Sequence, residues 1–284
     1  MVVFLTGLRR GFYTALPQHA LSRLGGWTAR HRGGPFTTGF IRWFIRRYGV
    51  NMAEAAEPDP RAYRSFNAFF TRALGAGARP QPVNSATVAS PVDGVVSACG
   101  PIEADTLIQA KGIGYSTMAL LGSEEAAARY RNGSFLTLYL RPCDYHRVHV
   151  PFAGDLQCIR HIRGRLWPVR PWAVEGIPGL FTRNERVTLE FDSDAGRYEL
   201  VMVGALMVGG LETIVTGPVR RGRLEPRIWN LEATPRRFER GDEIGRFNFG
   251  STVILLFPPG SIRLDPSFAP GTELHLGQAL DHTE

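Results

Sequence analysis

Three segments, far apart in the chain, carry side chains that could together supply an acid, a base and a nucleophile. They are Asp93 in a Pro-Val-Asp-Gly step, His146 and His149 in Tyr-His-Arg-Val-His, and Ser251 in Gly-Ser-Thr. Each lies at a predicted loop–strand junction, and an Asp, a His and a Ser can form the relay that activates a serine hydroxyl. The spacing alone is weak support, because most globular chains offer such a trio.

Each of these residues also has an ordinary structural interpretation. An Asp before Gly commonly bonds its own backbone in a turn, and residues 250–252 could be only the turn before a strand. The two histidines could be metal ligands, but no third ligand stands at a telling spacing, and we expect the nearby His161 at the surface. We therefore predict no metal site. If the histidine segment is extended, the two rings face opposite sides; in a turn, both could point inward.

The elements that must position these residues are mostly strands. Only 123–130, rich in alanine and followed by Asn132-Gly133, predicts a helix in this part of the chain. We expect an α+β fold, with a mostly antiparallel β barrel or sandwich over 81–284 and a helical region over 1–80. The predicted strands are short, β-branched and bounded by Gly, Pro, Asn or Asp: 92–99, 135–140, 145–152, 156–162, 186–191, 198–208, 213–219 and 252–257.

The net charge of +7 is concentrated at the N-terminus, where residues 1–50 hold eight arginines and no acid. The rest of the chain is close to neutral, so we predict no nucleic-acid partner. In 40–48 the apolar residues share one helical face, and Arg42, Arg46 and Arg47 fall off it. Such a helix suits the interface of an anionic membrane. An ordinary packing helix and an organellar transit peptide are the alternatives.

No run of about 20 apolar residues is present, so no membrane-spanning helix is predicted. A second helix is expected after Asp59 and Pro60, a credible N-cap and first helical residue. Its apolar residues keep helical spacing: Tyr63, Phe66, Phe70 and Leu74. Residues 75–82, rich in Gly and Pro, predict a linker into the β-rich part.

Six motifs together resemble the phosphatidylserine decarboxylase family of the bacterial type. The Tyr-His-Arg-Val-His block and the Gly-Ser-Thr step are the specific ones. Ala68 stands where the family usually has Glu, and Phe249 where Leu commonly precedes the cleavage glycine, but neither is a reacting group. The motifs follow the family's order: 66–72 (FNAFFTR), 91–94 (PVDG), 144–149 (DYHRVH), 184–187 (NERV), 203–205 (VGA), and 245–247 (GRF) with 250–252 (GST).

The resemblance implies a proenzyme that cuts its own chain. Asp93 would orient and charge His149, His149 would take the proton from Ser251, and the Ser251 hydroxyl would attack the carbonyl of Gly250. The products would be a large β chain, 1–250, and a small α chain, 251–284, that begins with a pyruvoyl group made from Ser251. The strand after Ser251 should keep the two chains together.

The resemblance further implies that the pyruvoyl group forms a Schiff base with the amine of phosphatidylserine, and that phosphatidylethanolamine and CO2 are released. His146 is the candidate proton donor, with His149 second. The implied partners are phosphatidylserine and an anionic membrane, at the cytoplasmic face of the cell membrane, and a higher homo-oligomer is plausible. Two alternatives stay open: a serine hydrolase using Asp93, His149 and Ser251, and a non-catalytic lipoyl-like β-barrel.

Overall fold

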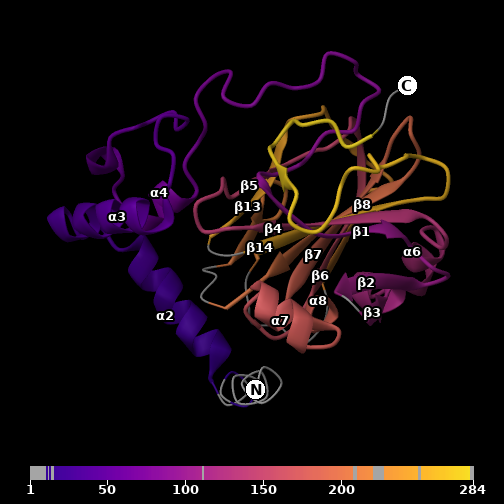
Figure 1. Cartoon of the computed structure of the whole chain (residues 1–284), viewed down its shortest axis with the longest axis horizontal. Coiled ribbons are helices and arrows are strands. Elements are labelled where there is room, and N and C mark those ends of the chain that lie inside the picture. The colour runs from indigo at the N-terminus through magenta and orange to yellow at the C-terminus, as the bar shows by residue number, and fades with distance from the viewer. Residues whose placement is uncertain are drawn as a thin grey trace.

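The computed structural model describes residues 11, 13, 16–110, 112–206, 210–219, 227–248 and 251–281. In these ranges most helices are short, and the first ones lie beside a β-rich body (Figure 1). The helical elements are α2 (Gln18–Arg30), α3 (Pro35–Tyr48), the 3-10 turn η1 (Pro60–Ala62), α4 (Phe66–Phe70), α5 (Thr117–Leu121), α6 (Glu124–Ala128), α7 (Pro171–Gly176) and α8 (Leu180–Arg183).

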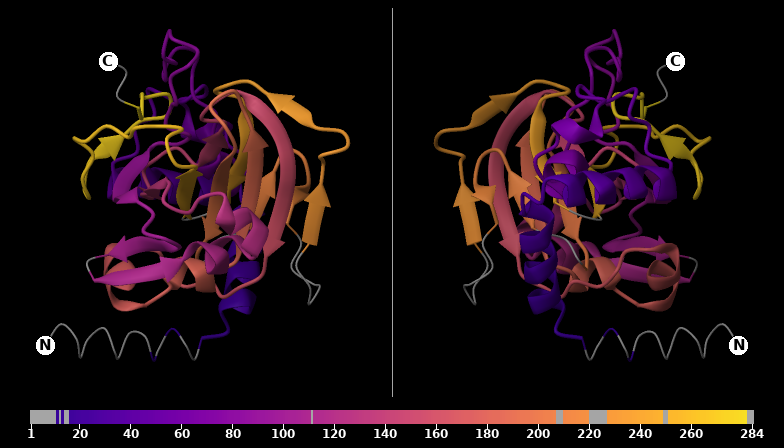
Figure 2. Two further views of the ribbon diagram at one scale, coloured as in Figure 1. Left: turned by 90° about the vertical axis from the view of Figure 1, so that its right-hand side faces the viewer. Right: turned by 90° about the vertical axis from the view of Figure 1, so that its left-hand side faces the viewer.

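The large sheet has the strand order β11-β6-β7-β8-β14-β4-β1-β15, with β12 paired to β6. Its strands curve strongly, as Figure 2 shows. Their bounds are β1 (Gly94–Pro101), β4 (Ser134–Leu140), β6 (Gly154–Ile162), β7 (Arg186–Asp192), β8 (Tyr198–Gly204), β11 (Arg227–Asn230), β12 (Arg236–Phe238), β14 (Ser251–Phe257) and β15 (Glu273–Leu274).

A smaller sheet has the order β10-β9-β13-β5, and β2 and β3 form a separate hairpin. Every strand pair in the described residues is antiparallel. The remaining bounds are β2 (Thr106–Ala110), β3 (Ile113–Ser116), β5 (Arg147–His149), β9 (Leu211–Thr213), β10 (Gly217–Pro218) and β13 (Glu243–Phe247).

These findings confirm the prediction of an α+β fold with mostly antiparallel strands. The prediction had allowed either a barrel or a sandwich, and the barrel is wrong. In the described residues the edge strands β11 and β15 do not pair with each other, so the large sheet is not closed. The reason is that the large sheet is covered on both faces and has short edge strands, so closure is not needed to protect it. The strand expected over 198–208 ends at Gly204, and 213–219 holds only the last residue of β9 and the two residues of β10.

Strand β14 runs through the centre of the large sheet, between β8 and β4, and all seven of its residues are buried. Because side chains alternate across a strand, it contributes to both faces. Val253, Leu255 and Phe257 join the core that the large sheet shares with β5, β9 and β13. Ile254 and Leu256 join a second core, formed with the β2–β3 hairpin and helices α5–α8. The sheet is therefore the middle layer of three.

The helical part has its own apolar cluster. The helix predicted around 40–48 is confirmed as α3, which ends at Gly49 in the left-handed conformation. Its Ile41 and Phe44 are buried with the aromatic side chains of α4. Figure 2, in its right-hand view, places these helices against the body. The boundary expected near residue 80 stays a prediction. No helix within the described ranges is long and apolar enough to cross a membrane.

The helix predicted to begin at Asp59 is wrong in its extent. Asp59 accepts a hydrogen bond from the Arg61 backbone, but it caps only the 3-10 turn η1. The chain is then extended at Tyr63 and again at Ser65, which interrupts the helix. Ser65 caps the separate helix α4 by accepting from the Ala68 backbone N–H. A second capping residue inside the apolar pattern therefore divides it into two elements.

Candidate active site

Ser251 is the first residue of β14 and is completely buried. Its backbone is paired with Gly204 of β8 and with Leu140 of β4. Strand β13 of the small sheet ends at Phe247, so the chain passes from one sheet to the other just before Ser251. Gly250, the predicted cleavage residue, lies outside the described residues, as does Phe249. Ser251 points toward the core between the two sheets, on the same face as Val253.

His146 faces this serine from the residue just before β5. Its Nδ1 lies 3.4 Å from the Ser251 Oγ, and its Nε2 lies 3.1 Å from the carbonyl oxygen of Arg141. A carbonyl only accepts, so Nε2 carries the ring proton and Nδ1 is the acceptor for the serine hydroxyl. Phe70 stacks on the ring at 4.0 Å between centroids. Burial, followed by the charge of Arg72, lowers the pKa of His146 to about 3.

His149 is held in a different way. Its Nδ1 donates to the Gly241 carbonyl oxygen at 2.6 Å, which leaves Nε2 to accept from the Tyr145 hydroxyl at 3.0 Å. Burial is the main cause that lowers the pKa of His149. Both histidines are therefore neutral at physiological pH. Of the two, the described contacts bring only His146 to Ser251.

Asp93 is buried and tied to other partners. Its two carboxylate oxygens accept from Nε and Nη2 of Arg79 at 2.9 and 2.7 Å, and Oδ1 also accepts from the Leu276 backbone N–H. Nδ1 of His275 lies 3.8 Å from Oδ1. No described contact joins Asp93 to His149, or His149 to Ser251. The self-cleavage roles given to Asp93 and His149 remain predictions.

Several residues around the site were not singled out from the sequence. Arg79 links Asp93 to Glu54, yet it lies in a stretch predicted to be a linker, which gave no signal. Asn67 and Phe70 lie inside the FNAFFTR motif, but the sequence gives neither of them a role at the site. The Asn67 side chain donates to that of Asn248, which in turn donates to the Gly210 carbonyl. This places α4 against the segment that leads into Ser251.

The expectation that His161 is a surface residue is wrong. It is 2% exposed, and its Nε2 lies 3.1 Å from a carboxylate oxygen of Glu185. Side chains alternate along β6, and this alternation turns His161 into the protein interior rather than toward solvent. A lone histidine in a sequence cannot reveal that direction. Among the described residues, no three His, Cys, Asp or Glu side chains gather as metal ligands.

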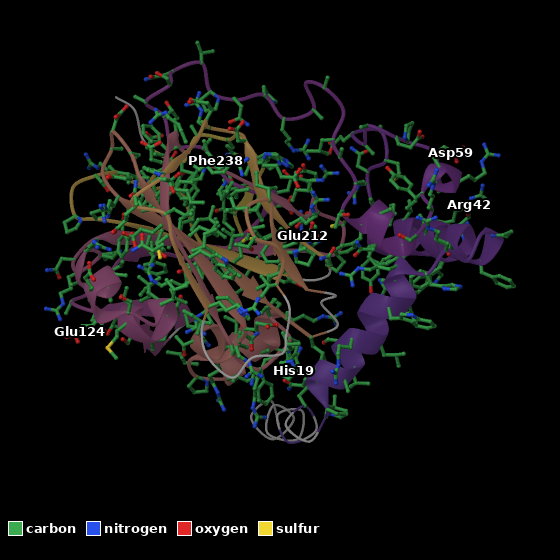
Figure 3. All side chains as sticks on the ribbon, turned by 180° about the vertical axis from the view of Figure 1, so that it is seen from behind. His19, Arg42, Asp59, Glu124, Glu212 and Phe238 are labelled. Atoms are coloured by element: carbon green, nitrogen blue, oxygen red, sulfur yellow. The ribbon has the colours of Figure 1, made fainter. Side chains whose placement is uncertain are left out.

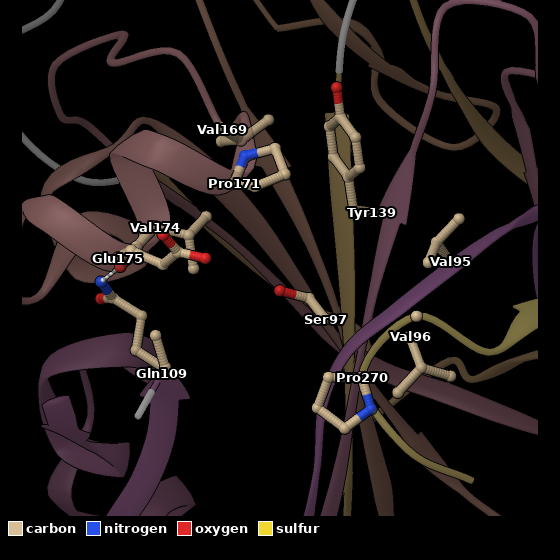
Figure 4. A pocket seen from close by; sticks show the side chains of 12 residues that line it. Val95, Val96, Ser97, Gln109, Tyr139, Val169, Pro171, Val174, Glu175 and Pro270 are labelled. Atoms are coloured by element: carbon tan, nitrogen blue, oxygen red, sulfur yellow. Dashed lines mark hydrogen bonds between the residues drawn. The ribbon is translucent and has the colours of Figure 1, made fainter. Parts of the chain in front are cut away.

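A cavity of about 220 Å³ lies on the other face of the large sheet (Figure 4). Tyr139 forms part of its wall and is paired with Thr252, whereas Ser251 is paired with the next residue, Leu140. Successive side chains of a strand point to opposite faces, so Tyr139 and Ser251 lie on opposite sides of the sheet. The cavity contains none of the predicted catalytic residues.

Fold and site together define a class of protein: a two-sheet β-rich body with a buried serine–histidine contact where the chain crosses between sheets. The model of the family described as phosphatidylserine decarboxylase matches residues 66–281, and a second model, described as PSD, matches 12–49. The chain belongs to the phosphatidylserine decarboxylase family.

Curated relatives support this over nearly the whole length. A phosphatidylserine decarboxylase proenzyme of Methylibium petroleiphilum is 50% identical over 269 residues, which cover 93% of this chain and 94% of the relative. Proteins with the same description from Acidovorax ebreus and Albidiferax ferrireducens are 48% and 46% identical, over 94% and 93% of this chain and 94% and 93% of the relatives. The match includes both the helical part and the β-rich body.

Proposed function

We propose that this protein decarboxylates phosphatidylserine to phosphatidylethanolamine and CO2, after cutting its own chain between Gly250 and Ser251. The observation that carries the proposal is the buried Ser251 hydroxyl, 3.4 Å from the acceptor nitrogen of a neutral histidine, at the start of a central strand. The description of the relatives as proenzymes supports a processing step.

The site fits a pyruvoyl group made from Ser251. The position is enclosed, the side chain has a hydrogen-bond partner, and the strand behind it is paired on both sides. When formed, this group supplies a carbonyl that takes the substrate amine and accepts the electron pair as CO2 leaves. His146, which contacts the Ser251 side chain, is the residue placed to hold a proton for the carbon that loses CO2.

The protonation state of the His146 ring depends on whether substrate is bound. In the free chain the ring is neutral, because burial and the Arg72 charge lower its pKa to about 3. An anionic substrate in the site offsets the charge of Arg72 and raises the pKa of His146. The substrate charge therefore shifts the ring toward its protonated form, although burial, the larger cause, still opposes it.

For self-cleavage we keep Asp93 and His149 as the charge relay to Ser251. In the described chain these residues are bonded to Arg79 and to Gly241 and Tyr145, respectively. The relay therefore requires an exchange of hydrogen bonds around His149. The products, 1–250 and 251–284, stay together because β14 is the central strand of the large sheet.

The helical part is proposed to dock on an anionic membrane at its cytoplasmic face. Helices α2 and α3 carry no acidic residue, and Arg42, Arg46 and Arg47 are exposed. Arg42 lies on the helical part, remote from the sheet region of Phe238 (Figure 3). Each such arginine contributes on the order of 1 kcal/mol near an anionic surface. Large apolar side chains are exposed beside them: Leu24, Trp27, Phe36, Phe40 and Trp43.

A groove of about 370 Å³ between these helices also supports docking. Its walls include Phe36, Phe40 and Phe66, so it suits the acyl part of a lipid. Phe66 belongs to α4, the helix whose Phe70 stacks on His146. The groove and the catalytic serine are therefore connected through one short helix.

The test combines intact mass with measured CO2 release from phosphatidylserine in detergent micelles. The purified protein should contain two chains split at Gly250–Ser251, with the small chain lacking a free amino terminus. Ser251→Ala should remain one inactive chain, whereas the control Ser261→Ala should be cut normally. A wild-type protein that stays intact, with Ser251 unmodified, would sink the proposal, and hydrolysis of an ester by that intact chain would favour the serine hydrolase.

A further inference from the structure

Arg72 is a buried cation with most of its hydrogen-bonding capacity unused. The residue is 5% exposed, and its Nη2 donates to the carbonyl oxygen of Cys143 at 3.2 Å. Among the described residues, its Nε and Nη1 have no hydrogen-bond partner. Burial is the main cause that lowers the pKa of Arg72. A buried charge with unpaired donors is costly to the folded state, so this side chain requires a reason other than stability.

The surroundings of Arg72 do not supply that reason. Its guanidinium lies 5.4 Å from the ring centroid of Phe69, a cation–π contact that leaves the Nε and Nη1 donors without an acceptor. Two carboxylates act on it only at a distance, those of Asp93 and Glu54, and both are already bonded to Arg79. The free donors of Arg72 thus face no anion of the described chain.

Arg72 follows closely on α4, the helix whose Phe70 contacts the histidine beside Ser251. It lies two residues after Phe70, whose ring stacks on His146. Its positive charge is also, after burial, the next cause of the lowered pKa of His146. On the other side, α4 packs with the helices that form the apolar groove. Arg72 therefore lies just beyond a helix that contacts both His146 and the apolar groove.

We propose that Arg72 binds the phosphodiester of the substrate headgroup; this inference rests on the proposed function. A guanidinium whose Nε and Nη1 have no acceptor can donate charge-assisted hydrogen bonds to the oxygens of a phosphodiester. In phosphatidylserine the phosphate stands between the reacting amine and the acyl chains, and Arg72 closely follows the helix that contacts both His146 and the groove. The serine carboxylate is the poorer match, because a cation that stabilises it in the ground state opposes loss of CO2.

The experiment compares four full-length proteins: wild type, Arg72→Met, Arg72→Lys and the control Arg64→Met. Arg64 is an exposed arginine of the preceding segment, so its loss makes the same charge change outside the site. For each protein we would measure cleavage by intact mass and the melting temperature. KM and kcat are then measured for phosphatidylserine in detergent micelles. Two added ligands report binding without activity through the melting shifts they cause. Glycerophosphoethanolamine has the amine and the phosphodiester but no carboxylate, and O-methylserine has the amine and the carboxylate but no phosphodiester.

Arg72→Met should be cut like wild type, and its melting temperature should be equal or higher, because an unpaired buried charge is removed. Its KM should rise roughly 10- to 100-fold, with Arg72→Lys in between and Arg64→Met unchanged. The melting shift with glycerophosphoethanolamine should disappear in Arg72→Met, while the shift with O-methylserine is kept.

Three results would overturn the proposal. In the first, Arg72→Met has the same KM as the Arg64→Met control. In the second, the melting temperature of Arg72→Met falls and Arg72→Lys restores it, while KM does not change in either variant. In the third, Arg72→Met loses only the melting shift with O-methylserine. Failure of the proposed function looks different: the wild type itself is then uncut or releases no CO2. The glycerophosphoethanolamine shift still tests Arg72 in that case.

Discussion

His146 Nδ1 lies 3.4 Å from Ser251 Oγ, and the contact joins the small sheet to the central strand of the large one. The carbonyl of Arg141 fixes the ring tautomer, so that the nitrogen facing the serine is an acceptor. His149, three residues on, has both ring nitrogens bonded elsewhere. The two histidines of one motif thus have different surroundings and can be tested separately.

The first prediction concerns these two histidines. His149→Ala should give one uncut chain, because the proposed relay to Ser251 is lost. His146→Ala should be cut but should release CO2 about 10²- to 10⁴-fold more slowly, the usual loss for a missing acid–base group. Intact mass and CO2 release measure the two steps, with the exposed His19→Ala as control. If cleavage is abolished only in His146→Ala, then His146, and not His149, is the base that takes the proton from the Ser251 hydroxyl.

A second prediction concerns the two chains after cleavage. Because β14 is paired on both sides and all its residues are buried, the small chain should remain bound in native buffer and separate only in concentrated guanidinium. Leu255→Ala should weaken this retention, since such a core truncation costs about 2–5 kcal/mol. Native gel filtration followed by a denaturing gel measures both. Loss of the small chain from wild type during gel filtration would contradict the idea.

A third prediction concerns Arg186, which is buried and donates to four backbone carbonyls. Those of Ala119 and Leu120 lie at the end of α5, and that of Thr182 lies at the end of α8. The fourth belongs to Asn184. A cation at helix C-termini is favourable, and removing it leaves these oxygens without donors.

Arg186→Met should therefore lower the free energy of unfolding by about 3–5 kcal/mol. Urea unfolding of the Ser251→Ala chain, which we expect to remain whole, gives this value. The control is Arg163→Met at an exposed arginine, which should change little. Equal stability of the two variants would show that Arg186 does not hold the helix ends.

A fourth prediction concerns pH and Glu199, which is fully buried on β8. Burial, and next the neighbouring Glu190, raise the pKa of Glu199 to about 7 from an ordinary 4.5. The folded chain then binds this proton more tightly than the unfolded chain does. Its contribution to stability is full below pH 4.5 and is lost as pH rises to about 7. The loss amounts to about 3 kcal/mol.

Glu199→Gln should remove this dependence, so that in the Ser251→Ala background the variant gains stability over its parent between pH 5 and pH 8. The exposed Glu232→Gln should follow the parent. Urea unfolding at the two pH values measures the difference. A parallel pH dependence in all three proteins would mean that Glu199 stays ionised, held by Arg160.

A fifth prediction concerns membrane docking by the helical part. The double variant Trp27→Ser and Phe36→Ser removes two exposed aromatic side chains and should weaken sedimentation with phosphatidylserine vesicles on the order of tenfold. Cleavage should be unchanged. Ile228→Ser, at an exposed apolar residue of β11, is the matched control. Equal binding by the double variant and the control would refute docking through these helices.

Local patterns in the sequence were sufficient for much of this fold. The central strand β14, the helix α3 and the antiparallel character follow from apolar periodicity and from turn residues, which act over a few neighbours. The helix expected from Asp59 failed because Ser65 starts a new one, a competition that periodicity alone does not settle. The hairpin β2–β3 and helices α5, α7 and α8 were also missed, since they are short.

The sequence by itself determined the residue types of the site, the order of the motifs and hence the family. Only the tertiary structure decided which histidine meets Ser251, that Asp93 is held by Arg79, and that Arg72 is buried with free donors. The physical reason is that these contacts join residues far apart in the chain. These contacts are set by which strands pair and by how the chain crosses from one sheet to the other. The spacing of neighbouring residues in the sequence determines neither.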